Sequence, residues 1–253
     1  MTDELQNVQD IAKLRANIEL AVLGKSDVVK LVVAALLAGE HVLLEDVPGV
    51  GKTLIAKAVA KSLDGRFSRL QFTPDLLPSD ITGSSIYNSS SGQFTFNPGP
   101  IFANVVLADE VNRAPPRTQS ALLEAMGEGQ VSVDGETHRL PTPLLVMATQ
   151  NPFEFEGTYL LPESQLDRFL LRVSVGYPQR EHERSLLKSH RVGEPVDQLQ
   201  PVLSAQRVLA LQQLARHVQF EDSLVEYLLD IVHATRNSDA LQVGVSTRGA
   251  LAF

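Results

Sequence analysis

Helix-like and strand-like hydrophobic patterns alternate along the first two-thirds of the chain. Residues 3–22 place apolar side chains mostly three or four positions apart, which predicts an amphipathic helix. Residues 28–38 are apolar nearly all round, so we expect a buried helix there. The run His41–Glu45 predicts a short buried strand, and helical spacing resumes over residues 53–63.

Two further apolar runs, Val105–Ala108 and Leu144–Ala148, predict strands of a parallel sheet that is covered on both faces. Strands that alternate with helices in this way predict an α/β fold with a doubly wound sheet. Two other segments predict hairpins instead. One spans residues 131–140 around Asp134-Gly135, and the other spans residues 84–96 around a Ser/Gly run.

Helices and polar connectors dominate after Pro178. Ser204 is a candidate N-cap for one helix, and the apolar positions of residues 224–232 mark another. The stretch Gly193-Glu194-Pro195 predicts a domain boundary. We therefore expect an α/β domain over residues 1–192 and a small all-α domain over residues 193–253.

Composition excludes several classes of protein. The 253 residues are 43% hydrophobic and 21% charged, an ordinary globular mixture that can bury a sizeable core. The lack of cysteine excludes a disulfide framework and thiolate metal sites. The net charge of −8 argues against extended binding to nucleic acid or anionic membranes. The polar start and the shortness of the apolar segments predict a soluble, cytoplasmic protein.

The first candidate site follows the predicted strand at residues 41–45. Residues 46–53 read DVPGVGKT and lead into a helix. A phosphate-binding loop needs free backbone N–H groups at a helix N-terminus, a lysine for the phosphates and a hydroxyl for magnesium. Asp46 stands where the strict pattern has its first glycine. The alternative is an ordinary strand-to-helix turn with a solvated lysine.

Two other strand ends carry polar side chains. Asp109 and Glu110 follow the strand that ends at Ala108. The first carboxylate can hold the water shell of magnesium, and the second can polarise the attacking water in phosphoryl transfer. Asn151 follows the next apolar strand and can orient water near a terminal phosphate, although asparagine before proline is also common in turns.

Together with Leu-Asp-Arg-Phe at 166–169 and Ser-Thr-Arg at 246–248, these motifs occur in the order of an AAA+ ATPase. The fuller wording, EDVPGVGKT at 45–53 and ADEVNRA at 108–114, resembles the MoxR family over nearly the whole chain. The resemblance implies a P-loop αβα core with a helical lid. It also implies that the 84–96 hairpin is the insert within the second helix and that the 131–140 hairpin precedes the sensor strand.

The resemblance also implies roles for individual residues. Glu110 would activate water, Asn151 would be sensor 1, and Arg168 would be the arginine finger that enters the neighbouring subunit's site. Thr53 and Asp109 would hold Mg²⁺. The implied nucleotide-binding residues are Val22, Leu23 and Gly24 beside adenine; Pro48, Gly49, Val50, Gly51, Lys52, Thr53 and Leu54 of the phosphate loop; and Arg248, sensor 2, which would reach the γ-phosphate from the lid. The family's lid continues past sensor 2, whereas Gly249–Phe253 alone follow here, so we expect a short or truncated lid.

The expected function is Mg²⁺-dependent ATP hydrolysis at the subunit interfaces of a ring, expected to be a hexamer, which remodels or matures protein clients. The resemblance implies a chaperone-like role, in some cases beside a partner with a von Willebrand factor A domain. Two alternatives stay open. One is an ATP-binding scaffold with little turnover, and the other is a nucleic-acid motor or transcriptional activator, which the acidic balance and the lack of a Gly-Ala-Phe-Thr-Gly-Ala loop disfavour.

Overall fold

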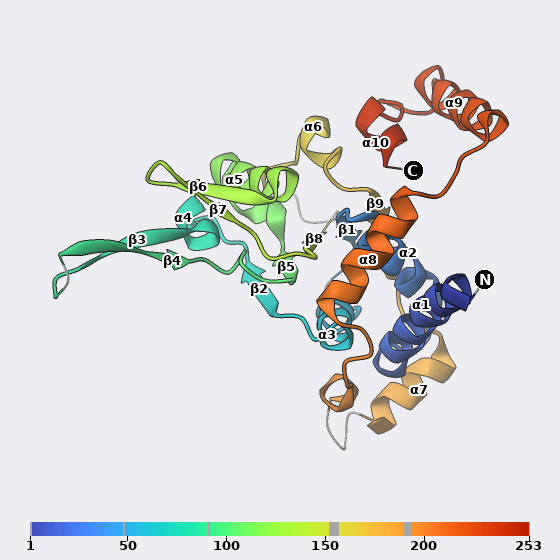
Figure 1. The fold of residues 1–253 in the computed structure, drawn as a ribbon, viewed down its shortest axis with the longest axis horizontal. Coiled ribbons are helices and arrows are strands. Elements are labelled where there is room, and N and C mark those ends of the chain that lie inside the picture. The colour runs from blue at the N-terminus through green and yellow to red at the C-terminus, as the bar shows by residue number, and fades with distance from the viewer. Residues whose placement is uncertain (1, 48, 91, 152–156, 190–193, 253) are drawn as a thin grey trace.

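A five-stranded sheet forms the centre of the molecule (Figure 1). The computed structural model describes residues 2–47, 49–90, 92–151, 157–189 and 194–252. The strands run in the order β2 (Phe67–Gln71), β5 (Val105–Asp109), β8 (Leu145–Gln150), β1 (Val42–Glu45) and β9 (Leu171–Val173), and neighbours pair in parallel. The predicted α/β fold with a parallel sheet is thus confirmed.

The sheet buries a hydrophobic cluster on each face, because successive side chains of a strand point to opposite sides. In β1, Val42 and Leu44 join one cluster and Leu43 joins the other. The first cluster lies under α1 (Thr2–Ala21), α2 (Ser26–Ala38) and α3 (Lys52–Ser62). The second lies under α5 (Pro116–Glu128), whose Leu122 and Met126 are buried in it. Helices on both faces explain why the inner strands are continuously apolar.

Both predicted hairpins are present. After the short helix α4 (Pro78–Thr82), β3 (Gly83–Asn88) pairs with β4 (Gln93–Pro98), and later β6 (Gln130–Val133) pairs with β7 (Glu136–Arg139). Asp134 and Gly135 have φ of 52° and 83°, so both central residues of the second turn have positive φ, as a type I′ turn requires. The ring of Phe96 stacks on His138 with centroids 3.8 Å apart, which joins the two hairpins.

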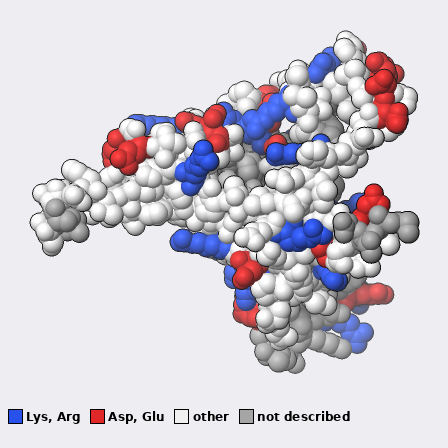
Figure 2. Space-filling model, viewed as in Figure 1, with Lys and Arg blue, Asp and Glu red and all other residues white. Residues whose placement is uncertain are grey.

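The β3–β4 hairpin projects from the body of the molecule at the left of Figure 1. No charged residue occurs between Asp80 and Asp109, so the projection lacks Lys, Arg, Asp and Glu and appears without blue or red atoms in Figure 2. Phe94 is 73% exposed on it, beside the ring of Tyr87.

In the C-terminal part of the chain, α6 (Glu163–Leu166), α7 (Arg180–Ser189) and α8 (Ala205–Arg216) lie near the α/β core, and α9 (Asp222–Arg236) and α10 (Thr247–Leu251) lie farther from it (Figure 1). The small α6 precedes β9, and α7 follows it. After a 3-10 turn at Pro195–Gln198, α8 begins at Ser204, whose hydroxyl accepts a hydrogen bond from the Arg207 N–H, as its predicted N-cap role requires. The remaining helices, α9 and α10, lie together at the upper right of Figure 1.

The first residues of the predicted all-α domain pack into the α/β core. Val196, Leu199, Val208 and Leu211 belong to the same hydrophobic cluster as the sheet, and α8 lies against α2. The boundary at residue 193 stays a prediction. Among the described residues, none of the helices combines the length and apolar character needed to cross a membrane.

Candidate functional site

The turn between β1 and α3 is built for close approach of a ligand to its backbone. Gly49 and Gly51 have φ of 86° and 97°, in the region that favours glycine, and a Cβ at either would meet no atom within 4 Å. Gly51 is the N-cap of α3 and offers no side chain to its free N–H groups. Such a helix N-terminus attracts anions. Pro48, predicted as part of this loop, lies outside the described residues.

Lys52 opens α3 with a half-buried ammonium group. Its Nζ donates to the carbonyl oxygen of Asp46 at 2.8 Å. Burial lowers the pKa of Lys52, and the carboxylates of Asp109, Asp46 and Glu110 act in the opposite direction. The ammonium therefore lies in the field of the three carboxylates around it.

Asp46, which replaces the first glycine of the strict loop pattern, ties the loop to the segment after β9. Its carboxylate accepts hydrogen bonds from Val47 N at 2.8 Å, Ser174 Oγ at 3.0 Å and Gly176 N at 2.5 Å. Burial alone raises the pKa of Asp46, but these bonds outweigh it and leave the pKa below its ordinary value. The aspartate thus has a local structural task that a glycine could not perform.

The same segment is held from its other side by Lys25. The Lys25 ammonium donates to the carbonyl oxygens of Val175 at 2.7 Å, Gly176 at 2.9 Å and Tyr177 at 2.8 Å. Three acceptors satisfy all three donors of the ammonium group. The turn that contains Lys25 and the phosphate loop therefore share one short segment, residues 174–177, as their common neighbour.

Asp109 and Glu110 lie at the carboxyl end of β5, where a threonine of β8 contacts the Asp109 carboxylate and the Glu110 backbone. Thr149 Oγ1 donates to Asp109 Oδ1 at 2.6 Å and accepts from the Glu110 N–H at 2.9 Å. Glu110 has φ of 58°, uncommon for a residue other than glycine and often found at functional sites. Its Oε2 accepts from Gln71 Nε2 at 3.0 Å and pairs with Arg113 Nε at 2.9 Å.

The phosphate loop and the strand ends line one pocket of about 420 Å³. Predicted residues that line it are Gly49, Gly51, Lys52, Thr53, Leu54, Asp109, Glu110 and Asn151. Sequence reasoning missed four other lining residues: Lys57, Arg69, Gln71 and Glu194. Arg69 and Gln71 lie two positions apart, on one face of β2. That spacing was the available signal, but the strand itself was not predicted.

A smaller apolar pocket of about 150 Å³ adjoins the loop. Val22 and Leu23, predicted to lie beside adenine, line it together with Gly49, Val50, Gly51 and Leu54 of the loop. Gly24 lies against the ring of His182: an added Cβ there would sit 2.6 Å from the imidazole Cγ. An apolar slot beside a phosphate-binding loop suits a flat aromatic base.

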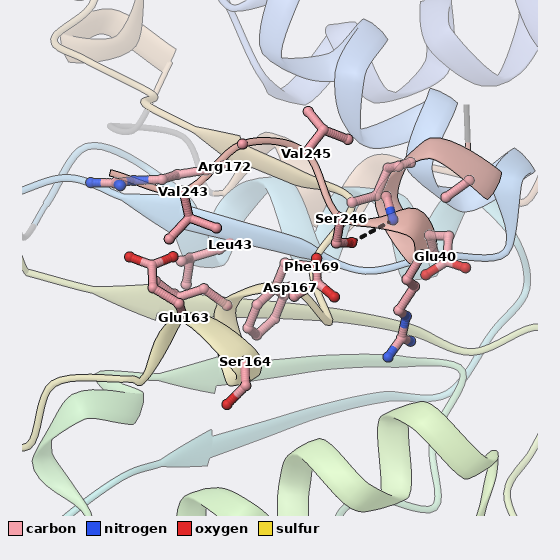
Figure 3. A pocket seen from close by; sticks show the side chains of 16 residues that line it. Glu40, Leu43, Glu163, Ser164, Asp167, Phe169, Arg172, Val243, Val245 and Ser246 are labelled. Atoms are coloured by element: carbon pink, nitrogen blue, oxygen red, sulfur yellow. Dashed lines mark hydrogen bonds between the residues drawn. The ribbon is translucent and has the colours of Figure 1, made fainter. Parts of the chain in front are cut away.

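The two predicted arginines lie elsewhere. Arg168 donates through Nη1 to the carbonyl oxygen of Leu123 on α5. Arg248, on α10, lines a different pocket of about 490 Å³ together with Glu40 and Arg172. Figure 3 shows this pocket between strand residues, α6 and the segment that precedes α10. Arg248 and Lys52 thus line different pockets of this chain, and the sensor 2 role of Arg248 stays a prediction.

The oxygen donors of the pocket that Lys52 lines fit Mg²⁺. Thr53 and Asp109 both line it and offer a hydroxyl and a carboxylate, the hard oxygen ligands that Mg²⁺ prefers. In the described part of the chain, no group of three or more His, Cys, Asp or Glu side chains is arranged to hold a metal by itself. Mg²⁺ commonly binds through one or two protein oxygens plus substrate phosphates, so the sparse donor set is sufficient.

Comparison with known proteins decides the family. Residues 41–171 match the model described as "ATPase family associated with various cellular activities (AAA)". The chain is 52% identical to the uncharacterized protein YeaC of Bacillus subtilis over 96% of its own length and 76% of that protein. It is 47% identical to the chaperone MoxR1 of Mycobacterium tuberculosis over 87% of its own length and 58% of that protein. The chain belongs to the MoxR family of AAA+ ATPases.

A solved structure agrees with this assignment. The crystal structure of a candidate ATPase from Cytophaga hutchinsonii superposes with a TM-score of 0.88 at 39% identity, covering 98% of this chain and 78% of that one. The chain also matches the MoxR protein of Methylorubrum extorquens at 34% identity, over 68% of its own length and 51% of that protein. Membership of the MoxR family implies nucleotide binding and confirms the resemblance drawn from the motifs.

Proposed function

We propose that this MoxR-family chain is a Mg²⁺-dependent ATPase that cleaves the β–γ phosphoanhydride bond of ATP. The observation that carries the proposal is that Lys52, Thr53, Asp109, Glu110 and Asn151 line a single pocket. A cationic donor, two metal-binding oxygens, a carboxylate base and an amide are the groups that phosphoryl transfer to water requires. They come from three separate stretches of sequence that meet at one edge of the sheet.

Binding would be divided between the two adjoining pockets. The apolar pocket lined by Val22 and Leu23 would take the adenine ring, and the backbone N–H groups around Gly51 with the Lys52 ammonium would take the phosphates. Thr53 and Asp109 would hold Mg²⁺, which neutralises charge on the phosphate oxygens when it is bound. Pro48 completes the proposed loop.

Glu110 would be the general base. Its carboxylate lies in the same pocket as Lys52 and can accept a proton from a water aligned with the terminal phosphate. Asn151 would orient that water through its uncharged amide, which adds no charge near the phosphates. Since the backbone N–H of Glu110 is held by Thr149, the position of the base is fixed from its main chain.

The proposal extends to an assembly. Arg168 would act as the arginine finger of a neighbouring subunit in a ring, expected to be a hexamer, and Arg248 would serve as sensor 2 from a helical lid formed by residues 193–253. The cycle would remodel or mature protein clients, with a von Willebrand factor A domain protein as a possible partner class. MoxR1 is named a chaperone, which supports this part of the proposal.

The deciding experiment compares wild type with Glu110→Gln. We expect the variant to bind ATP with wild-type affinity by calorimetry while phosphate release falls at least 10²-fold, in line with the usual contribution of a general base. Glu128→Gln, at the exposed C-terminal end of α5, is the matched control and should release phosphate at the wild-type rate. Unchanged release by Glu110→Gln would remove Glu110 as the base.

A specific observation favours a second candidate, an ATP-binding scaffold with little turnover. The Glu110 carboxylate contacts both Gln71 and Arg113, and these two contacts restrict its rotation toward a water molecule. If wild type binds ATP but releases phosphate no faster than a blank without protein, the scaffold is correct. A nucleic-acid motor gains no such support, because Lys and Arg are dispersed among Asp and Glu on the face in Figure 2.

A further inference from the structure

The carboxylate of Asp109, which we propose as a ligand of the metal ion, is paired with a guanidinium group. Arg69, on the edge strand β2, places Nη2 2.6 Å from Asp109 Oδ2. The other oxygen, Oδ1, accepts from Thr149 at 2.6 Å. Both oxygens of the proposed metal ligand are therefore engaged, and Arg69 and Asp109 line the same pocket as Lys52 and Thr53.

We propose that Arg69 competes with the divalent cation for Asp109, so that metal-bound nucleotide must displace the guanidinium to complete the site. This inference rests on the proposed function. A guanidinium in contact with Oδ2 occupies part of the space around that oxygen, to which Mg²⁺ would have to come within about 2.1 Å to bind directly. The positive charge of Arg69 also opposes a second cation beside it. The guanidinium of Arg69 thus balances the negative charge of Asp109, which a bound metal ion would otherwise balance.

The surroundings of Arg69 allow the exchange. Its side chain is 50% exposed, whereas that of Asp109 is 14% exposed, so the arginine is the partner with freedom to move. The same nitrogen also donates to Gln71 Oε1 at 3.4 Å. Once displaced, the guanidinium remains on the wall of the pocket. There it can pair with a phosphate oxygen, which attracts arginine strongly.

The size of the competition follows from the exposure of the pair. An ion pair with one half-exposed partner is weak, so its loss should change the apparent affinity for the metal by about two- to fivefold. The proposal thus predicts a modest change in the metal requirement that leaves the chemistry intact.

The test measures Mn²⁺ binding by electron paramagnetic resonance, with and without ADP, in wild type, Arg69→Gln and Arg69→Lys. We expect Arg69→Gln to bind Mn²⁺ about two- to fivefold more tightly than wild type and Arg69→Lys to lie between them. Lys57→Gln is the charge-matched control. Lys57 lines the same pocket but pairs with Glu194 at 3.6 Å, so its loss should move the Mn²⁺ affinity less than half as far.

Several results would overturn the inference. Unchanged or weaker Mn²⁺ binding by Arg69→Gln would show that Arg69 does not compete, and an equal effect of Lys57→Gln would reduce the finding to a general field effect. ADP binding in excess EDTA is measured in parallel. Weakened ADP binding there with an unchanged Mn²⁺ affinity would make Arg69 a phosphate ligand instead. Absence of nucleotide binding by folded wild type would refute the proposed function and, with it, this inference.

Discussion

At the scale of single residues, several of the polar side chains that meet in the pocket come from segments that follow strands. Lys52, Asp109 and Asn151 could be brought together from sequence, because parallel strands end at the same edge of a sheet. The contacts of Arg69 and Gln71 with the acidic pair could not. These contacts depend on the register between β2 and β5, which sets Gln71 opposite Asp109. They also depend on β2 itself, which contains no continuous hydrophobic run that would predict a strand.

Asp46 gives the first prediction at this scale. Asp46→Ala removes the acceptor of three hydrogen bonds and should lower the free energy of unfolding by about 1–3 kcal/mol, measured by urea denaturation. Asp46→Gly restores the strict loop pattern and should be destabilised similarly, since glycine lacks the carboxylate. Asp230→Ala, exposed on α9, is the control. A neutral or stabilising Asp46→Gly would contradict the structural role given to Asp46.

His41 predicts a pH dependence of stability. Its Nδ1 accepts from Val146 N at 3.1 Å, so Nε2 carries the proton and donates to Met126 O at 3.3 Å. Burial lowers the pKa of His41 from 6.5 to about 4. Between these values the unfolded chain binds the extra proton. The free energy of unfolding should therefore fall as the pH drops from 6.5 toward 4, by at most about 1.4 kcal/mol per pH unit.

The measurement is chemical denaturation at several pH values across that window. His41→Asn should be less stable at neutral pH but should lose less stability on acidification, because the titrating group is gone. His217→Asn, on the exposed end of α8, should keep the wild-type slope. Equal slopes for His41→Asn and wild type would rule out His41 as the source.

At the scale of elements, the inner strands and the helices α1, α2, α3, α8 and α9 were predicted, whereas α5 and the outer strands were not. β1, β5 and β8 are buried on both faces, so they are continuous apolar runs. The edge strand β2 has the sequence FSRLQ and exposes Arg69 and Gln71, and β9 has three residues. Neither strand has an alternation of apolar and polar residues long enough to distinguish it from a loop. Their existence depends on pairing with neighbours that the sequence specifies elsewhere.

Ser204 provides a prediction for one element. Its hydroxyl accepts from the Arg207 N–H at 3.2 Å and begins α8. Ser204→Ala should lower the free energy of unfolding by about 1 kcal/mol, because it leaves that donor without its cap. Ser204→Asp keeps an acceptor and should be close to wild type, so equal losses in both variants by urea denaturation would contradict the capping role.

At the scale of the whole molecule, the residues given to the nucleotide and the two arginines separate. Lys52 and Glu110 line one pocket, while Arg248 lines another and Arg168 is held by α5. For Arg248, the sequence order of the motifs could not predict this separation, because the path of the chain after β9 decides where α10 lies. α8 returns to pack on α2, which leaves α9 and α10 beyond it.

This separation predicts complementation between subunits. Arg168→Ala and Glu110→Gln should each lose ATP turnover alone, and mixed assemblies should regain part of it, since some interfaces then join an intact Arg168 to an intact Glu110. A finger supplied in trans contributes about 10³-fold or more to hydrolysis, so the recovery is measurable by phosphate release. Mixed rings, verified by native mass spectrometry, that stay inactive would place Arg168 within its own subunit's site or in a purely structural role.

The grip of Lys25 and Asp46 on residues 174–177 has a mechanical consequence. Because Lys25 holds this stretch to the turn at residues 22–25 and Asp46 holds it to the phosphate loop, a displacement of either should be transmitted to it. It leads directly into α7. We therefore expect a ligand that displaces the loop to displace α7 as well, and loss of the Lys25 or the Asp46 contacts should uncouple the helix from the ligand.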